Sequence, residues 1–198
     1  MAKKYTSGEI SHSFWQKEFS IAVKLHLQGK TPEEMRRLSI EENVYNQPTE
    51  RRKVSVAQVM NKRIMHSNDK LLTIFNDLSN DNQRLVNLCA IMATNQLLHD
   101  FVIEDFRNEI ILGDATIENR EWLKFFRRKD IESNDIANWS DETKNRMSRL
   151  IKTYVREAGL TKYEDQVDKI QFHLLDFKLV DTLNEIGHSN YIAAFTGV

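Results

Sequence analysis

Residues 83–112 read QRLVNLCAIMATNQLLHDFVIEDFRNEIIL, and apolar side chains fall on several faces of the helix that this run predicts. A helix that is apolar on more than one side packs inside a protein rather than along its surface. We allow for a break near Asn95, and Gly113 is a natural end of the run. The fold is therefore predicted to be mainly helical, with this run at its centre.

Helix signals also lie on both sides of the central run. Thr31-Pro32-Glu33-Glu34 combines an N-cap threonine, a proline at the first helical position and a capping-box glutamate. The connection before it is short, so the flanking helices are expected to be neighbours in a helix-turn-helix-like pair. Helices are predicted over 13–28, 32–42, 49–64, 69–78, 117–129, 140–158 and 181–186, and short strands over 170–175 and 177–180.

The predicted fold class is mainly α, a compact multi-helix protein with a short β-containing C-terminal region. The order of helix, glycine turn and short strands near the C-terminus is similar to that of a winged helix. Three segments are predicted: a basic helical N-terminal subdomain (1–66), a central helical core (67–138) and a C-terminal helix with short strands (139–198). A single domain that contains all three segments is the alternative.

Composition excludes several classes of protein. The chain has 198 residues, 28 Lys and Arg against 29 Asp and Glu, and one cysteine, which excludes disordered and disulfide-stapled proteins. The longest apolar run, residues 88–93, is far shorter than the roughly 20 residues that span a bilayer. No export signal is visible, and Cys89 is expected to be buried. We therefore expect a cytoplasmic protein that contacts no membrane.

The usual signatures of catalysis are missing from the sequence. No two glycines lie closer than ten residues apart, which excludes the glycine-rich loops that hold nucleotide phosphates. The histidines and the lone cysteine lack zinc-ligand spacing, and no Gly-x-Ser-x-Gly motif occurs. We therefore predict no catalytic residue, no metal and no cofactor. The less favoured alternative is a metal-dependent nuclease, in which Asp168 would act with Asp176 and Lys178 on neighbouring strands.

Basic side chains are concentrated in the N-terminal third of the chain. Residues 1–66 carry a net charge of +5, whereas residues 67–140 carry −5. Basic helix surfaces commonly contact the phosphates of nucleic acids, although a charged face that only meets water is the simpler alternative. The predicted nucleic-acid contacts on the second and third helices are Arg36, Arg37, Arg51, Arg52, Lys53, Lys62 and Arg63. A secondary strip on the 140–158 helix comprises Arg149, Lys152 and Arg156.

Motifs distributed along the chain, taken together, resemble one protein family. They are Phe14-Trp15-x-x-Glu18, Leu27-x-Gly29-x-Thr31-Pro32-Glu33-Glu34, Glu42-Asn43, Thr49-x-Arg51-Arg52, Trp139-Ser140-Asp141-Glu142-Thr143 and Glu157-Ala158-Gly159-Leu160. This series resembles the BrxA proteins of bacterial BREX phage-defence systems and covers nearly the whole chain. The resemblance implies a helical, NusB-like accessory protein with no known catalytic activity that binds DNA and works with other BREX proteins. Members have also carried an inner-membrane label, which this sequence does not support.

Two classes of function follow from these observations. The leading hypothesis is a non-enzymatic component of a phage-defence system that binds nucleic acid, preferably duplex DNA, with RNA as a variant. The alternative is an adaptor whose charged faces dock other BREX proteins, with DNA binding incidental and exposed aromatic side chains as further anchors. The candidate anchors are Trp15, Trp122 and Phe126, although core packing is the more common role of such residues.

Overall fold

The computed structural model describes residues 4–8 and 12–197, and most of these residues are helical. Residues 1–3, which begin the predicted N-terminal subdomain, lie outside the described part. The elements are α1 (Gln16–Leu27), α2 (Pro32–Glu41), α3 (Glu50–His66), α4 (Asp69–Ile74), η1 (Phe75–Asp77), α5 (Asn80–Met92), α6 (Gln96–Asp100), η2 (Phe101–Phe106), α7 (Arg107–Leu112), β1 (Thr116–Ile117), α8 (Asn119–Glu132), α9 (Asn134–Ala137), α10 (Asp141–Glu157), β2 (Thr161–Glu164), β3 (Val167–Ile170), α11 (Phe177–Glu185) and α12 (Ser189–Thr196). The predicted mainly α class with a short β-containing region is confirmed.

Two of the predicted helix caps, at Thr31 and Ser140, are confirmed in atomic detail. Thr31 and Glu34 form the reciprocal capping box, because the Glu34 N–H donates to Thr31 Oγ1 at 3.2 Å and the Thr31 N–H donates to Glu34 Oε2 at 2.8 Å. Ser140 caps α10 by accepting from the Thr143 N–H at 3.2 Å. Each cap satisfies a backbone donor that the first helical turn leaves unpaired.

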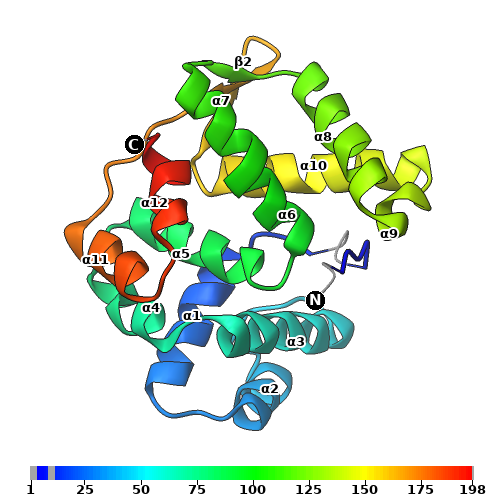
Figure 1. Ribbon diagram of the computed structural model, residues 1–198. Coiled ribbons are helices and arrows are strands. Elements are labelled where there is room, and N and C mark those ends of the chain that lie inside the picture. The colour runs from blue at the N-terminus through cyan, green and yellow to red at the C-terminus, as the bar shows by residue number, and fades with distance from the viewer. Residues whose placement is uncertain (1–3, 9–11, 198) are drawn as a thin grey trace.

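The central run forms the buried middle of the molecule, as its sequence predicts. It divides into α5, α6, the π-helical segment η2 and α7, with a break at Asn95, whose side chain accepts from the Leu98 N–H at 2.9 Å. These green helices lie between the α1–α4 region and the α8–α10 region (Figure 1). Cys89 is buried there, and burial raises the pKa of its thiol to about 12.

One hydrophobic cluster runs through all three predicted segments. It includes Phe14 and Phe19 from the first, Leu88 and Phe101 from the second, and Phe195 from the third. The division into subdomains at residues 66 and 138 stays a prediction. Within the described part of the chain, no helix is long and apolar enough to cross a membrane.

The sheet differs from the predicted strands. It has the order β1-β3-β2 with antiparallel pairs. The strands predicted over 170–175 and 177–180 are wrong, because β3 ends at Ile170 and α11 begins at Phe177. Between them the chain forms no ladder: Leu174 is 93% exposed, and the buried Asn82 donates to its carbonyl oxygen at 3.2 Å. Alternating side chains indicated a strand here, but no second strand lies alongside to pair with it.

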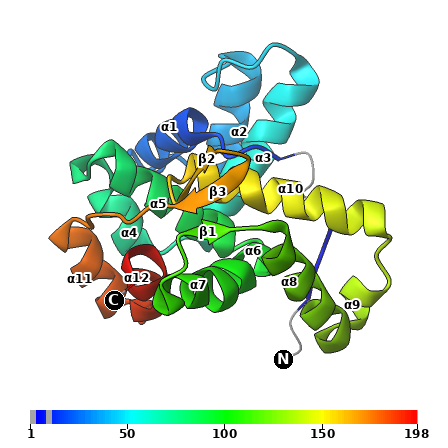
Figure 2. The same ribbon diagram turned by 90° about the horizontal axis from the view of Figure 1, so that it is seen from above.

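The segment from β1 to β3 has the element order of a winged helix. β1, α8, α9, α10, β2 and β3 follow one another, and the β2–β3 hairpin turns through Asp165 and Gln166, which both have left-handed backbone angles. Figure 2 shows this sheet beside α10, while α2 and α3 lie at a separate edge of the molecule. The similarity to a winged helix stays a prediction, and the strands that follow α10 pair over residues 161–170 rather than 170–180.

A buried ionic cluster attaches α8 to the central run. The fully buried Lys129 ammonium lies 2.7 Å from Asp100 Oδ2, 3.1 Å from Glu104 and 2.8 Å from Glu132. The Tyr5 hydroxyl donates to the same Asp100 oxygen at 2.6 Å. Burial alone would lower the pKa of Lys129, but the hydrogen bonds to Asp100 and Glu132 hold that pKa above its usual value.

Replacement of Lys129 by alanine is expected to destabilise the protein strongly. The change leaves the buried Asp100 carboxylate without its cation, which should lower the free energy of unfolding by about 3 to 5 kcal/mol. Lys124→Ala on the exposed side of the same helix is the matched control, and we expect a change of about 0.5 kcal/mol or less. Urea denaturation followed by circular dichroism measures both. Equal losses for the two variants would contradict a special role for the buried cluster.

Candidate nucleic-acid interface

Helices α2 and α3 form an antiparallel pair. Asn61 Nδ2 on α3 donates to the Pro32 carbonyl at the start of α2 at 2.7 Å. At the other end of the pair, Ser39 Oγ donates to the Lys53 carbonyl at 2.8 Å. The two helices therefore run in opposite directions. The short connection from α1 does not make α1 and α2 close partners, because each of them packs mainly against α3.

Four of the predicted arginines lie exposed on this pair. Arg36 and Arg37 project from α2, and Arg51 and Arg52 project from the first turn of α3. None of the four forms an ion pair with another described residue. Lys62 is also exposed and lies about three helical turns after Arg51, on the same side of α3. We call these five residues the basic face.

Two predicted members do not belong to the basic face. Arg63 is only 2% exposed, and its guanidinium donates to the carbonyls of Phe14 at 2.5 Å and Ser13 at 2.8 Å. This prediction is corrected: Arg63 supports the fold and cannot reach a phosphate. Lys53 is largely covered, and its ammonium donates to the Ile40 carbonyl at 3.3 Å and Glu50 at 2.5 Å. It stabilises the turn that joins α2 to α3.

The three cations of the secondary strip on α10 are not all free at the surface. Arg149 is exposed, whereas Lys152 is half-buried with its ammonium 5.2 Å from the centre of the Trp122 ring. Arg156 donates twice to the buried Asp168, at 2.5 and 2.9 Å, which holds the pKa of the guanidinium above its usual value. Of the three predicted contacts, Arg149 alone is exposed and makes no ion pair within the described chain.

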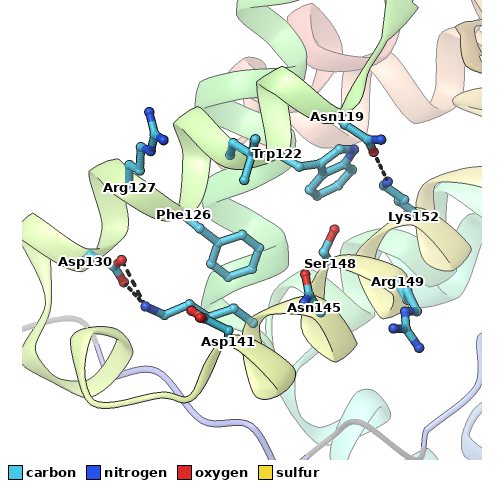
Figure 3. Close-up of a pocket in the computed structure, with 12 residues that line it drawn as sticks. Asn119, Trp122, Phe126, Arg127, Asp130, Asp141, Asn145, Ser148, Arg149 and Lys152 are labelled. Atoms are coloured by element: carbon cyan, nitrogen blue, oxygen red, sulfur yellow. Dashed lines mark hydrogen bonds and ion pairs between the residues drawn. The ribbon is translucent and has the colours of Figure 1, made fainter.

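A groove of about 690 Å³ separates α8 from α10 beside this strip. Figure 3 shows Trp122 and Phe126 of α8 facing Asn145 and Ser148 of α10 across it. The predicted anchors Trp122 and Phe126 are 5% and 8% exposed, so they form the floor of the groove rather than projecting into solvent. Trp15, the third predicted anchor, is partly buried against the core.

An ion pair and a hydrogen bond connect the two walls of this groove. Lys144 lies 2.8 Å from Asp130 at one end, and Lys152 Nζ donates to Asn119 Oδ1 at 3.3 Å at the other. The dashed lines of Figure 3 mark both links. A second hollow of about 650 Å³ shares Asn119, Arg149 and Lys152 and continues toward the β2–β3 hairpin.

The residues of the nuclease alternative are engaged separately. Asp168 is bound by Arg156, Asp176 caps α11 by accepting from the Lys178 N–H at 2.9 Å, and the Lys178 ammonium lies 2.8 Å from Asp77. No group of three or more His, Cys, Asp and Glu side chains within residues 4–8 and 12–197 is arranged to hold a metal ion. The strand that the alternative required between Asp168 and Asp176 is not formed.

Comparisons with known proteins agree on one family and one fold. The model of the family described as BrxA matches residues 3–187. A protein of Bacillus cereus (strain H3081.97), described as BREX protein BrxA, is 24% identical over 164 residues, which cover 83% of this chain and 82% of that protein. A crystal structure of an uncharacterized protein from Magnetospirillum magneticum superposes with a TM-score of 0.78 at 18% identity, covering 99% of this chain and 100% of that one. That structure shows the shared fold.

Alanine substitutions at Arg63 and Arg52 should separate the two roles that arginines have on α3. Arg63→Ala removes a buried side chain together with its hydrogen bonds to the carbonyls of Phe14 and Ser13, so we expect the free energy of unfolding to fall by about 2 to 4 kcal/mol. Arg52→Ala replaces an exposed side chain and should change the free energy of unfolding by about 0.5 kcal/mol or less. Urea titrations of both variants test this difference, and an Arg63→Ala protein as stable as wild type would contradict the buried role.

Proposed function

The chain belongs to the BrxA family of BREX phage-defence proteins, and we propose that it is a non-enzymatic component that binds duplex DNA through the basic face. The observation that carries this proposal is the set of four exposed arginines on α2 and α3 that form no ion pair within the described chain. Several other surface cations have a neighbouring carboxylate as partner, such as Lys70, whose ammonium lies 2.8 Å from Glu185. Membership of a BREX system also implies other BREX components as partners.

An unpaired arginine binds a polyanion more readily than a cation that already has a carboxylate partner. A cation that already has a carboxylate partner must give it up to bind a phosphate, whereas an unpaired surface arginine releases only the counterions of the DNA. Guanidinium groups also bind phosphate oxygens with two parallel hydrogen bonds. Such contacts fix a duplex on the protein without reading its bases. We therefore propose binding without base specificity.

The winged-helix order of β1 to β3 favours α10 as an alternative DNA-contacting helix. Its charges argue against it, because Arg146 pairs with Glu142 at 3.2 Å and Arg156 pairs with Asp168 at 2.5 Å. Arg149 is then the one exposed cation of the predicted strip without a partner among the described residues. One cation releases too few counterions to hold a duplex at physiological salt. We therefore assign the main contact to α2 and α3.

A salt titration of fluorescent duplex DNA tests this proposal. Wild-type protein should bind with a log–log salt slope of roughly −3.5 if the four arginines neutralise about four phosphates. Arg51→Glu/Arg52→Glu should abolish binding near 100 mM salt, because it replaces two attractive contacts with two repulsive ones. The matched control on α10, Arg146→Glu/Arg149→Glu, should bind as wild type does. All measurements use a buffer that contains a chelator, which prevents any metal-dependent cleavage of the probe.

The other outcomes point to different surfaces or functions. Loss of binding in the α10 variant alone would move the interface to the winged-helix-like segment. No duplex binding by wild-type protein near 100 mM salt would overturn the proposal and favour the adaptor hypothesis. Tighter binding of an RNA duplex of the same length would replace DNA by RNA as the ligand.

A further inference from the structure

The groove between α8 and α10, with a volume of about 690 Å³, is a hollow that the duplex proposal does not use. Its floor is apolar, its two ends are closed by the Lys144–Asp130 and Lys152–Asn119 links, and Leu123 stands on its rim with 60% of its surface exposed. Because the links fix the separation of the two helices, the groove exists before any ligand enters. A preformed groove loses little conformational entropy on binding.

The charges around the groove are not balanced. Asp130 is neutralised by Lys144, and Asp141 lies in the first turn of α10, where the helix dipole compensates a negative charge. Arg127 and Arg149 are exposed and make no ion pair with any described residue. The excess positive charge predicts an anionic ligand.

Lys152 adds a cation that is only partly solvated. Its ammonium has an amide oxygen at 3.3 Å and an indole ring at 5.2 Å, but no carboxylate within ion-pair distance among the described residues. Burial lowers the pKa of Lys152, because the ammonium loses water and has no carboxylate within ion-pair distance among the described residues in compensation. A carboxylate placed in the groove would supply that compensation.

The aromatic floor argues against a nucleic acid in this groove. Phe101 stacks on the Trp122 ring with the centroids 4.1 Å apart, and Phe125 meets Phe126 edge to face at 5.3 Å. Both groove aromatics are more than nine-tenths buried, so neither offers a free face on which a base could stack.

From these observations we infer that the α8–α10 groove binds an acidic, amphipathic segment of a partner protein. Carboxylates of the segment meet Arg127, Arg149 and Lys152, and an aliphatic side chain rests on the exposed Leu123. Grooves between two helices commonly accept peptides in this way, with apolar anchors inside and charges at the rim. This docking surface is separate from the basic face, so its test does not depend on DNA binding.

Fluorescence anisotropy with a defined peptide tests the inference on the full-length chain. The probe is a fluorescein-labelled peptide with glutamate and leucine at helical spacing, and its controls carry serine in place of leucine or lysine in place of glutamate. We expect saturable binding of the first peptide with a Kd below about 100 μM, and no saturation by either control. Amide signals of Asn145 and Ser148 and the Trp122 indole N–H signal should shift in NMR spectra of the complex.

Matched variants locate the site. Arg127→Glu/Arg149→Glu should weaken the peptide at least about tenfold. Arg146→Glu lies on the same helix outside the groove and should change affinity by less than about twofold. Both arginines of the double variant are exposed, so we expect the variant to fold. Circular dichroism checks this expectation.

Three results would overturn the inference. The first is the absence of saturable binding up to about 1 mM peptide. The second is binding that is lost in Arg51→Glu/Arg52→Glu but kept in the groove variant, because it would place the peptide on the basic face. The third is duplex DNA that shifts the same groove signals and displaces the peptide, because it would make the groove a nucleic-acid site.

Discussion

The buried contact between Lys129 and Asp100 determines where α8 packs on the central run of helices. It fixes α8 against the junction of α6 and the π-helical segment, and Glu104 and Glu132 complete the shell of acceptors around the ammonium. A buried ammonium tolerates little displacement, since each lost partner leaves a charge uncompensated at low dielectric. The position of α8, and with it the groove shared with α10, therefore depends on this cluster.

Local signals predicted the helices well because their causes are local. The Thr31 capping box, the Ser140 cap and the break at Asn95 each involve residues three or four positions apart. The strands were predicted poorly because a strand needs a partner. β1 has two residues and pairs with β3 across about fifty positions, whereas the alternating residues after Ile170 have no strand beside them and are held by Asn82 instead.

The candidate site could be predicted only in part, for the same reason. Composition identified the basic N-terminal third, and helical spacing could have separated Arg63 from its neighbours, since it follows Val56 and Met60 on the buried side of α3. The partner of Arg156 could not be predicted, because Asp168 reaches it through a hairpin that the sequence did not reveal. The groove between α8 and α10 could not be predicted either, because it depends on how two separate helices pack together. Charge patterns therefore identified the cationic residues but not which of them remain unpaired.

The contacts of Tyr5 affect the order of events during synthesis. Its backbone N–H donates to Asp135 and its hydroxyl to Asp100, residues that follow it by 130 and 95 positions. A ribosome releases Tyr5 long before either partner has been translated, and contacts of such long separation form slowly because of the loop that they close. The N-terminal segment therefore docks after α6, α8 and α9 have assembled, and it joins the first residues of the chain to a core that is made much later.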